Sequence, residues 1–148
     1  MDYIKISENL LDLLENNYIK YYDTLCNLKD TYDTDTIKKI VDYNAYRTYF
    51  GNHLHSLIYL TGDLKELPPD NATNFYGYNS VIPEDFAIKI FNKLLEYNVN
   101  VYQLNYYNQN PLQNIMCEEC YSYRINNNKL KQAIKNKYIY DLDKTLIQ

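Results

Sequence analysis

The chain has 148 residues, of which 46% are hydrophobic and 16% aromatic. This is enough apolar material for one domain with a packed core, and it excludes a wholly disordered chain. The net charge of −4 disfavours nucleic-acid binding, since nucleic-acid-binding proteins need a cationic face to displace counterions. The basic residues that do cluster fall on one expected helix and indicate a solvated helix face: Lys129, Lys131, Lys135 and Lys137.

The N-terminal third predicts a pair of helices. Apolar residues at near-helical spacing indicate a helix from a Ser7 cap to about Lys29. After a turn, a second helix begins at a Thr34 cap, and its apolar pattern stops near Tyr43. We expect these helices, within about residues 1–47, to form an N-terminal cap.

The rest of the chain also predicts helices. One helix opens near Asn52 and stops at Gly62, a residue suited to the end of a helix. A long turn-rich segment follows at residues 63–82, and segments of this length inside small domains are often functional. Residues 99–104 have a β-like composition, but we interpret them as the arm of a turn. Further helices are expected from Pro83, from Pro111, and over about Asn128 to Lys137.

The sequence contains an internal repeat. Residues 40–45 (IVDYNA) and 94–99 (LLEYNV) share the same pattern of two apolar residues, an acid, Tyr, Asn and a small or branched apolar residue. Each copy is followed by a loop and then by Asn, one residue and Leu, at 52–54 and at 110–112. Repetition of a helix–loop–helix unit favours a solenoid over a plain helical bundle.

The segment 94–115 resembles the junction between two ankyrin repeats, in which a helix ends, a finger-shaped hairpin follows, and Thr-Pro-Leu-His begins the next helix. Asn98 stands at the family's glycine after the helix, and Asn108 stands at the glycine of the finger tip. Asparagine is the next best residue at positive φ, and the Asn110 side chain can cap the next helix as threonine does. Gln113 replaces the family's histidine, which leaves that residue's backbone bond in doubt.

The resemblance implies an all-α fold, a short ankyrin-like solenoid with an N-terminal helical cap. It places one domain over residues 1–148, with ankyrin-like repeats over about 48–148 and an insertion near 63–82. Such degenerate repeats, rich in Asn and Tyr, resemble the ankyrin proteins of poxviruses and other large DNA viruses. The implied function is non-enzymatic binding of another protein, a host defence or signalling factor, in the host cytoplasm.

No catalytic signature is evident, and we expect no cofactor. Cys117 and Cys120 form a C-x-x-C pair, but a structural zinc site needs four ligands, and the remaining candidates are Cys26, His53 and His55. The two histidines lie two residues apart at a helix start and therefore point in different directions. We expect two half-buried thiols and no metal, and we expect His55 to tie down backbone rather than to act as a base.

Tyrosines supply the candidate binding surface, because a Tyr side chain offers a large contact area and has few rotatable bonds that lose freedom on binding. The candidate protein-binding residues lie on the finger and on the insertion: Tyr102, Tyr106 and Tyr107, and Phe75, Tyr76 and Tyr78. The chain contains 19 tyrosines, so local packing of these residues is the competing interpretation. A second class of function also fits the acidic charge, a small helical inhibitor from a phage or mobile element that mimics nucleic acid.

The N-terminal sequence lacks a basic start followed by an apolar run, so no secretion signal is expected. No apolar stretch is long enough to span a bilayer, and membrane association is not expected. The three cysteines are sparse and odd in number, which fits a reducing compartment. We therefore expect a cytoplasmic protein.

Overall fold

The computed structural model describes residues 2–46, 51–64, 81–117 and 124–147. Within these ranges the fold is all-α, apart from one pair of two-residue antiparallel strands. The elements in chain order are α1 (Tyr3–Asn16), α2 (Tyr18–Asn27), the short 3₁₀ helix η1 (Leu28–Asp30), α3 (Thr34–Asp42), α4 (His53–Leu60), β1 (Asp63–Leu64), α6 (Glu84–Glu96), α7 (Pro111–Met116), β2 (Arg124–Ile125) and α8 (Asn128–Ile147).

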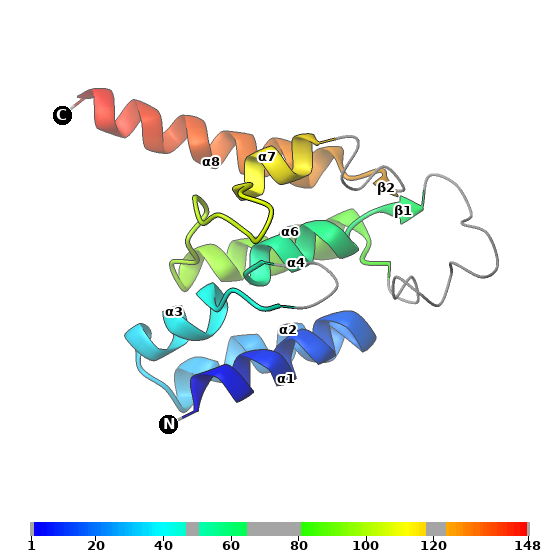
Figure 1. Cartoon of the computed structure of the whole chain (residues 1–148), viewed down its shortest axis with the longest axis vertical. Helices are drawn as coiled ribbons and strands as arrows, with labels where there is room; N and C mark the ends of the chain where they lie inside the picture. Colours follow the sequence, from blue (N-terminus) through cyan, green and yellow to red (C-terminus); the bar gives the residue numbers. More distant parts are fainter. Residues whose placement is uncertain (1, 47–50, 65–80, 118–123, 148) are drawn as a thin grey trace.

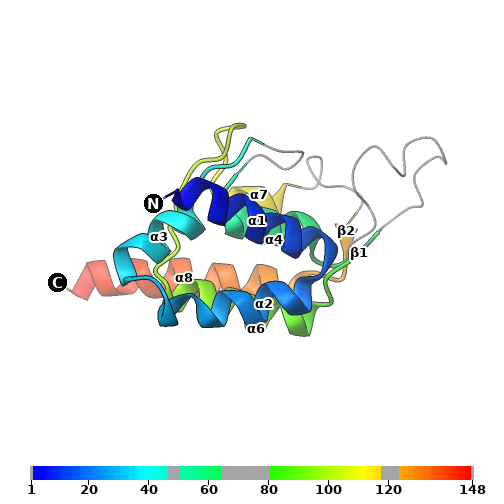
Figure 2. The same cartoon turned by 90° about the horizontal axis from the view of Figure 1, so that it is seen from below.

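The helices are stacked in layers of antiparallel pairs (Figure 1). The α1/α2 pair forms one end, the α4/α6 pair lies in the middle, and the α7/α8 pair forms the other end. Seen from below (Figure 2), α1, α4 and α7 lie in one row and α2, α6 and α8 in another, and neighbours within each row are in contact. Helix α3 bridges the first two layers because it packs against both α1 and α4.

Helical periodicity explains which faces are buried. On α6 the buried residues Ala87, Ile90, Phe91 and Leu94 follow the i, i+3, i+4, i+7 spacing of one helix face. Helix α4 differs, since all of its residues from His53 to Leu60 are buried. A helix that is buried on every side must lie inside the molecule, and α4 indeed contacts α1, α3, α6 and α7.

The first predicted helix is in fact two helices. Asn17 interrupts it and caps α2, because its side-chain oxygen accepts a hydrogen bond from the Lys20 N–H at 3.2 Å. Ser7 was expected to cap the helix, but it lies inside α1 and is fully buried, and Asp2 is the cap. The Asp33 side chain caps α3 in place of Thr34.

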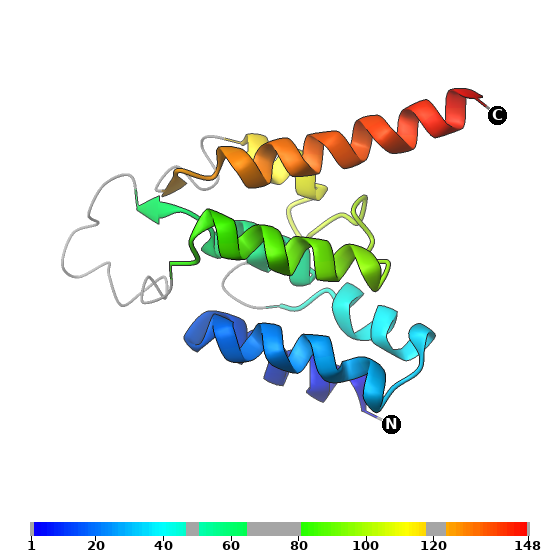
Figure 3. The ribbon, with the colours of Figure 1, turned by 180° about the vertical axis from the view of Figure 1, so that it is seen from behind.

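The end of the last helix and a short strand pairing differ from the sequence-based expectation. Helix α8 continues ten residues beyond Lys137 to Ile147, which projects its C-terminal half past the stack (Figures 1 and 3). The short pairing of β1 with β2 joins the ends of the middle and last layers and was not expected. The arm at residues 99–104 contains no strand, as predicted.

In the described part of the chain, every helix is too short or too polar to cross a membrane.

Candidate functional site

The finger, residues 99–109, leaves α6 through a left-handed asparagine. Asn98 has φ of 60°, the Val99 N–H donates to the Leu94 carbonyl, and the Asn98 N–H donates to the Leu95 carbonyl. This pair of bonds is the Schellman ending of a helix, in which glycine is usual and asparagine is tolerated. The prediction that Asn98 takes the place of glycine is confirmed.

The finger tip turns through a second left-handed asparagine. Asn108 has φ of 61°, and its N–H donates to the Asn105 carbonyl at 3.0 Å. The buried Asn105 side-chain oxygen accepts from the N–H groups of Tyr107 and Gln109, at 2.8 and 3.0 Å. The tip is therefore held by its own side chains, and the predicted role of Asn108 is confirmed.

The helices that follow the two loops begin with the same cap. The Asn110 oxygen accepts from the Gln113 N–H, and the Gln113 oxygen accepts from the Asn110 N–H. Asn52 and His55 form the same reciprocal capping box at the start of α4. Gln113 thus makes the local backbone bond that the loss of histidine had left in doubt.

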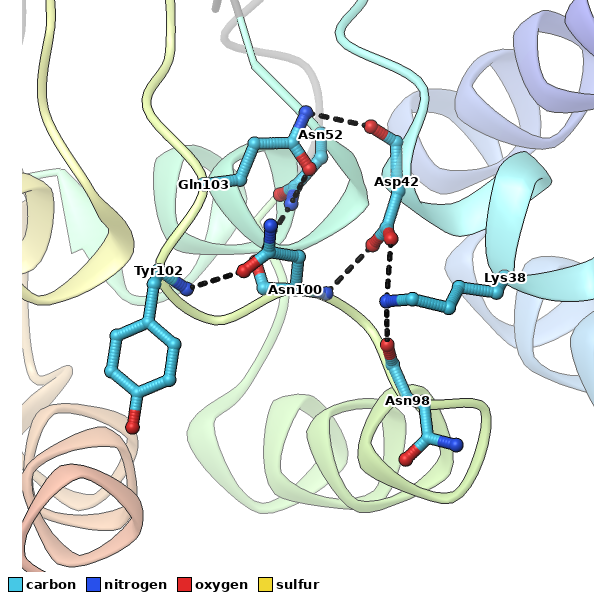
Figure 4. A network of polar contacts seen from close by, with 7 residues as sticks. All are labelled: Lys38, Asp42, Asn52, Asn98, Asn100, Tyr102 and Gln103. Carbon is cyan, nitrogen blue, oxygen red and sulfur yellow. Dashed lines mark hydrogen bonds and ion pairs between the residues drawn. The ribbon is translucent and has the colours of Figure 1, made fainter. Parts of the chain in front are cut away.

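A polar network ties the finger to the preceding layer (Figure 4). One Asp42 carboxylate oxygen accepts from the Asn100 N–H at 2.6 Å, and the other accepts from Lys38, which also donates to the Asn98 carbonyl. The amide nitrogen of Asn52 donates to the Asn100 carbonyl and to the Gln103 side chain. The finger base is therefore fixed by α3 and by the cap of α4.

His55 links the start of α4 to the far end of the finger. Its Nδ1 accepts from the Asn52 N–H, so Nε2 carries the proton and donates to the Gln109 carbonyl at 3.0 Å. Burial lowers the pKa of His55 to about 4, so the ring is neutral near pH 7. Gly51 packs directly against the His55 side chain. A Cβ atom at position 51 would lie 2.4 Å from the His55 Cβ, so a larger residue does not fit there. The expectation that His55 ties down backbone is confirmed.

Large apolar side chains remain exposed on this braced loop. Tyr106 and Tyr107 are 50% and 61% exposed, and Leu104 is 51% exposed. Tyr46, from the loop before α4, is 76% exposed and meets the Tyr106 ring edge-on at 5.2 Å between centroids. The Tyr106 hydroxyl donates to the Asn44 carbonyl, so the two neighbouring loops form one aromatic surface.

Tyr102 has a different setting from the other finger tyrosines. Its hydroxyl donates to Asp141 on α8, and its ring lies 4.8 Å from the Tyr138 ring. Tyr138 in turn donates to the Val101 carbonyl. Burial and the adjacent Asp141 carboxylate raise the pKa of Tyr102 to about 12. Tyr102 is thus half exposed but anchors the finger to the last layer.

Three predicted site residues cannot be placed, and two exposed residues near the finger were not predicted. Phe75, Tyr76 and Tyr78 lie outside the described residues. Tyr46 and Leu104 were missed, since their exposure depends on how the two loops pack together. A weak signal for Tyr46 exists, because it directly follows the repeated Tyr-Asn-Ala segment that corresponds to the base of the finger.

A buried hydrogen-bonded chain connects the first layers. The Ser7 hydroxyl donates to the Ile40 carbonyl and therefore accepts from Nε2–H of His53, which leaves His53 Nδ1 to accept from the Tyr21 hydroxyl. Ser7, Tyr21 and His53 are fully buried. A serine whose proton is held by a carbonyl, out of reach of solvent, acts as a structural link and not as a nucleophile.

The two histidines face different groups. His53 faces Ser7 and Tyr21, whereas His55 faces Asn52 and Gln109. Within the described ranges no group of three or more His, Cys, Asp or Glu residues could hold a metal ion. Cys117 is disulfide-bonded, which corrects the expectation of a free thiol at that position, and Cys26 is a free thiol.

The left-handed conformation of Asn98 makes a testable prediction. Asn98→Gly is expected to leave the free energy of unfolding within about 0.5 kcal/mol of wild type, because glycine reaches positive φ without strain. Asn98→Val is expected to lower it by about 2 kcal/mol, since a branched Cβ clashes in this conformation. Urea denaturation followed by circular dichroism measures both, and equal stabilities for the two variants would contradict the assignment.

Searches against protein-family models, curated proteins and solved structures find no match to this chain. The functional interpretation therefore depends on the geometry described above.

Proposed function

We propose that the chain is an ankyrin-like module that binds another protein through its finger. The paired helices stacked in two rows support an ankyrin-like arrangement, as do the matching capping boxes and the left-handed asparagines at the base and the tip of the finger. Stacked units of this kind act as rigid scaffolds that present loops and concave surfaces to a partner.

The observation that carries the proposal is the exposure of apolar side chains on a braced loop. Tyr106, Tyr107 and Leu104 are half exposed or more. The base of the same finger, at residues 100 and 101, is hydrogen-bonded to α3, to the cap of α4 and to α8. Aromatic anchors on a pre-organised backbone lose little conformational entropy on binding, which favours a protein interface. The resemblance to poxvirus ankyrin proteins makes a host defence or signalling protein the proposed partner.

The alternative of an acidic inhibitor that mimics nucleic acid has less support. Several described acids are already paired with lysines, so their charge is partly compensated. These pairs are Asp42 with Lys38, Asp85 with Lys129, Glu96 with Lys93, and Asp141 with Lys137. A surface that imitates a phosphate backbone needs uncompensated carboxylates.

The test is the double variant Tyr106→Ala with Tyr107→Ala. Immobilised wild-type protein is used to capture a host protein from lysate, and the captured protein is then purified and titrated against each variant. We expect the double variant to bind at least about tenfold more weakly, as central aromatic anchors do. Its circular dichroism spectrum should match that of wild type.

The matched control is Ile19→Ala, which removes a similarly exposed side chain from α2, at the opposite end of the stack. This variant should bind as wild type does. Equal affinity for the double variant and the control would exclude the finger as the interface.

A further inference from the structure

The C-terminal half of α8 exposes an apolar stripe away from the finger tip. Ile139, Leu142 and Leu146 are 54%, 58% and 73% exposed. Their i, i+3, i+7 spacing places them on one side of the helix. The opposite side packs inward through the buried residues Leu130 and Ile134. The stripe therefore faces away from the domain's own core.

Charged side chains flank this stripe with opposite signs. Lys135 precedes Ile139 by four residues and Asp143 follows it by four, so both lie on the stripe, one turn to either side of Ile139. Among the described residues, neither forms an ion pair, whereas Lys137 and Asp141 on the inner side pair with each other. The stripe is thus positive at one end and negative at the other.

This pattern is complementary to itself. When two α8 helices cross antiparallel at Ile139, Lys135 of each copy lies opposite Asp143 of the other. A parallel crossing would instead place like charges together and is disfavoured. A surface that matches its own image under a two-fold rotation is the requirement for an isologous dimer.

The shape of the molecule leaves this surface accessible. The C-terminal half of α8 projects beyond α6 and the finger in opposite views (Figures 1 and 3), so this part of the helix is open to a second copy. A hollow of about 720 Å³ adjoins the stripe between α8 and Tyr102, and Ile139 and Leu142 line both. The surface is therefore indented, which provides room for side chains of a partner helix.

We propose that two copies of this chain associate through an antiparallel pairing of their α8 helices centred on Ile139. The contact is smaller than a standard interface, so the dissociation constant is expected to be roughly 10–100 µM. Leu142 of each copy packs beside Ile139 of the other, and two symmetric Lys135–Asp143 pairs fix the direction. This surface borders the finger base at Tyr102 but does not include Tyr106 and Tyr107, so the dimer presents two finger tips to partners.

The test uses charge reversal and sedimentation equilibrium at low salt. Lys135→Glu alone and Asp143→Lys alone each create two like-charge contacts and should weaken self-association about tenfold. An equimolar mixture of the two variants should regain dimers, because each contact then joins opposite charges. Only direct contact between these two positions in different copies produces this recovery.

A third variant, Leu142→Ser, should be monomeric and retain the wild-type circular dichroism spectrum. The proposal is overturned if the wild-type protein remains monomeric at 1 mM, or if the mixture associates no better than the single variants. Either result would leave the finger proposal unaffected, because that proposal depends on Tyr106 and Tyr107, which lie outside this surface.

Discussion

Replacing His53 by leucine is expected to lower the free energy of unfolding by about 3 kcal/mol. His53 is the only described partner of the Tyr21 hydroxyl, and both side chains are fully buried. Without the ring nitrogen, this hydroxyl is left without an acceptor, which costs about 1–3 kcal/mol. Ser7 also loses a donor, although it still donates to the Ile40 carbonyl, and the branched leucine does not match the shape of the planar ring.

The double variant Tyr21→Phe with His53→Leu provides the control. Removing both partners of a buried hydrogen bond costs less than removing one, so the two losses should be less than additive by at least about 1 kcal/mol. Urea denaturation of the single and double variants measures this coupling. Strictly additive losses would mean that the Tyr21–His53 bond is absent from the folded protein.

Replacing Asn52 by alanine is expected to destabilise the fold by about 3 kcal/mol and to loosen the finger. The buried Asn52 oxygen accepts from the N–H groups of Leu54 and His55, and loss of a helix cap costs about 1–2 kcal/mol. Its amide nitrogen also donates to the Asn100 carbonyl and to Gln103, both of which lose a bond to the preceding layer.

Asn110→Ala is the matched control for Asn52→Ala, because Asn110 forms the same capping box and is only partly buried. It should cost only about 1 kcal/mol, the usual value for a helix cap. The difference between the two variants isolates the bonds that Asn52 makes to the finger. Equal losses, measured by thermal or urea denaturation, would show that these bonds contribute nothing.

Local backbone chemistry made parts of the fold and site predictable. A left-handed corner and a helix cap depend on a few neighbouring residues, so the roles of Asn98, Asn108 and Asn110 follow from the sequence. Asn126 also has positive φ, 61°, but no repeat pattern surrounded it and it was not predicted. The extension of α8 to Ile147 was missed as well, since its C-terminal half lacks the inward apolar stripe on which the prediction depended.

Long-range contacts could not be predicted. Serine is a common helix cap, and only contacts with distant residues, the Ile40 carbonyl and His53, explain the burial of Ser7 inside α1. In the same way, the sequence placed Tyr102 with Tyr106 and Tyr107 on the finger but gave no sign that Asp141 holds it. Exposure of Tyr46 beside Tyr106 likewise depends on how two loops pack together that are far apart in the sequence.

Amide hydrogen exchange in the finger tests the central claim most directly, namely that asparagines and cross-layer hydrogen bonds hold this loop in one conformation. The N–H groups of Asn100, Asn105 and Asn108 donate to Asp42, Gln109 and Asn105 respectively. Measured by NMR in the wild-type protein, these amides should exchange at least about 100-fold more slowly than in an unstructured chain. Exchange at the rate of an unstructured chain would contradict a pre-organised finger and remove the basis for its role as a binding surface.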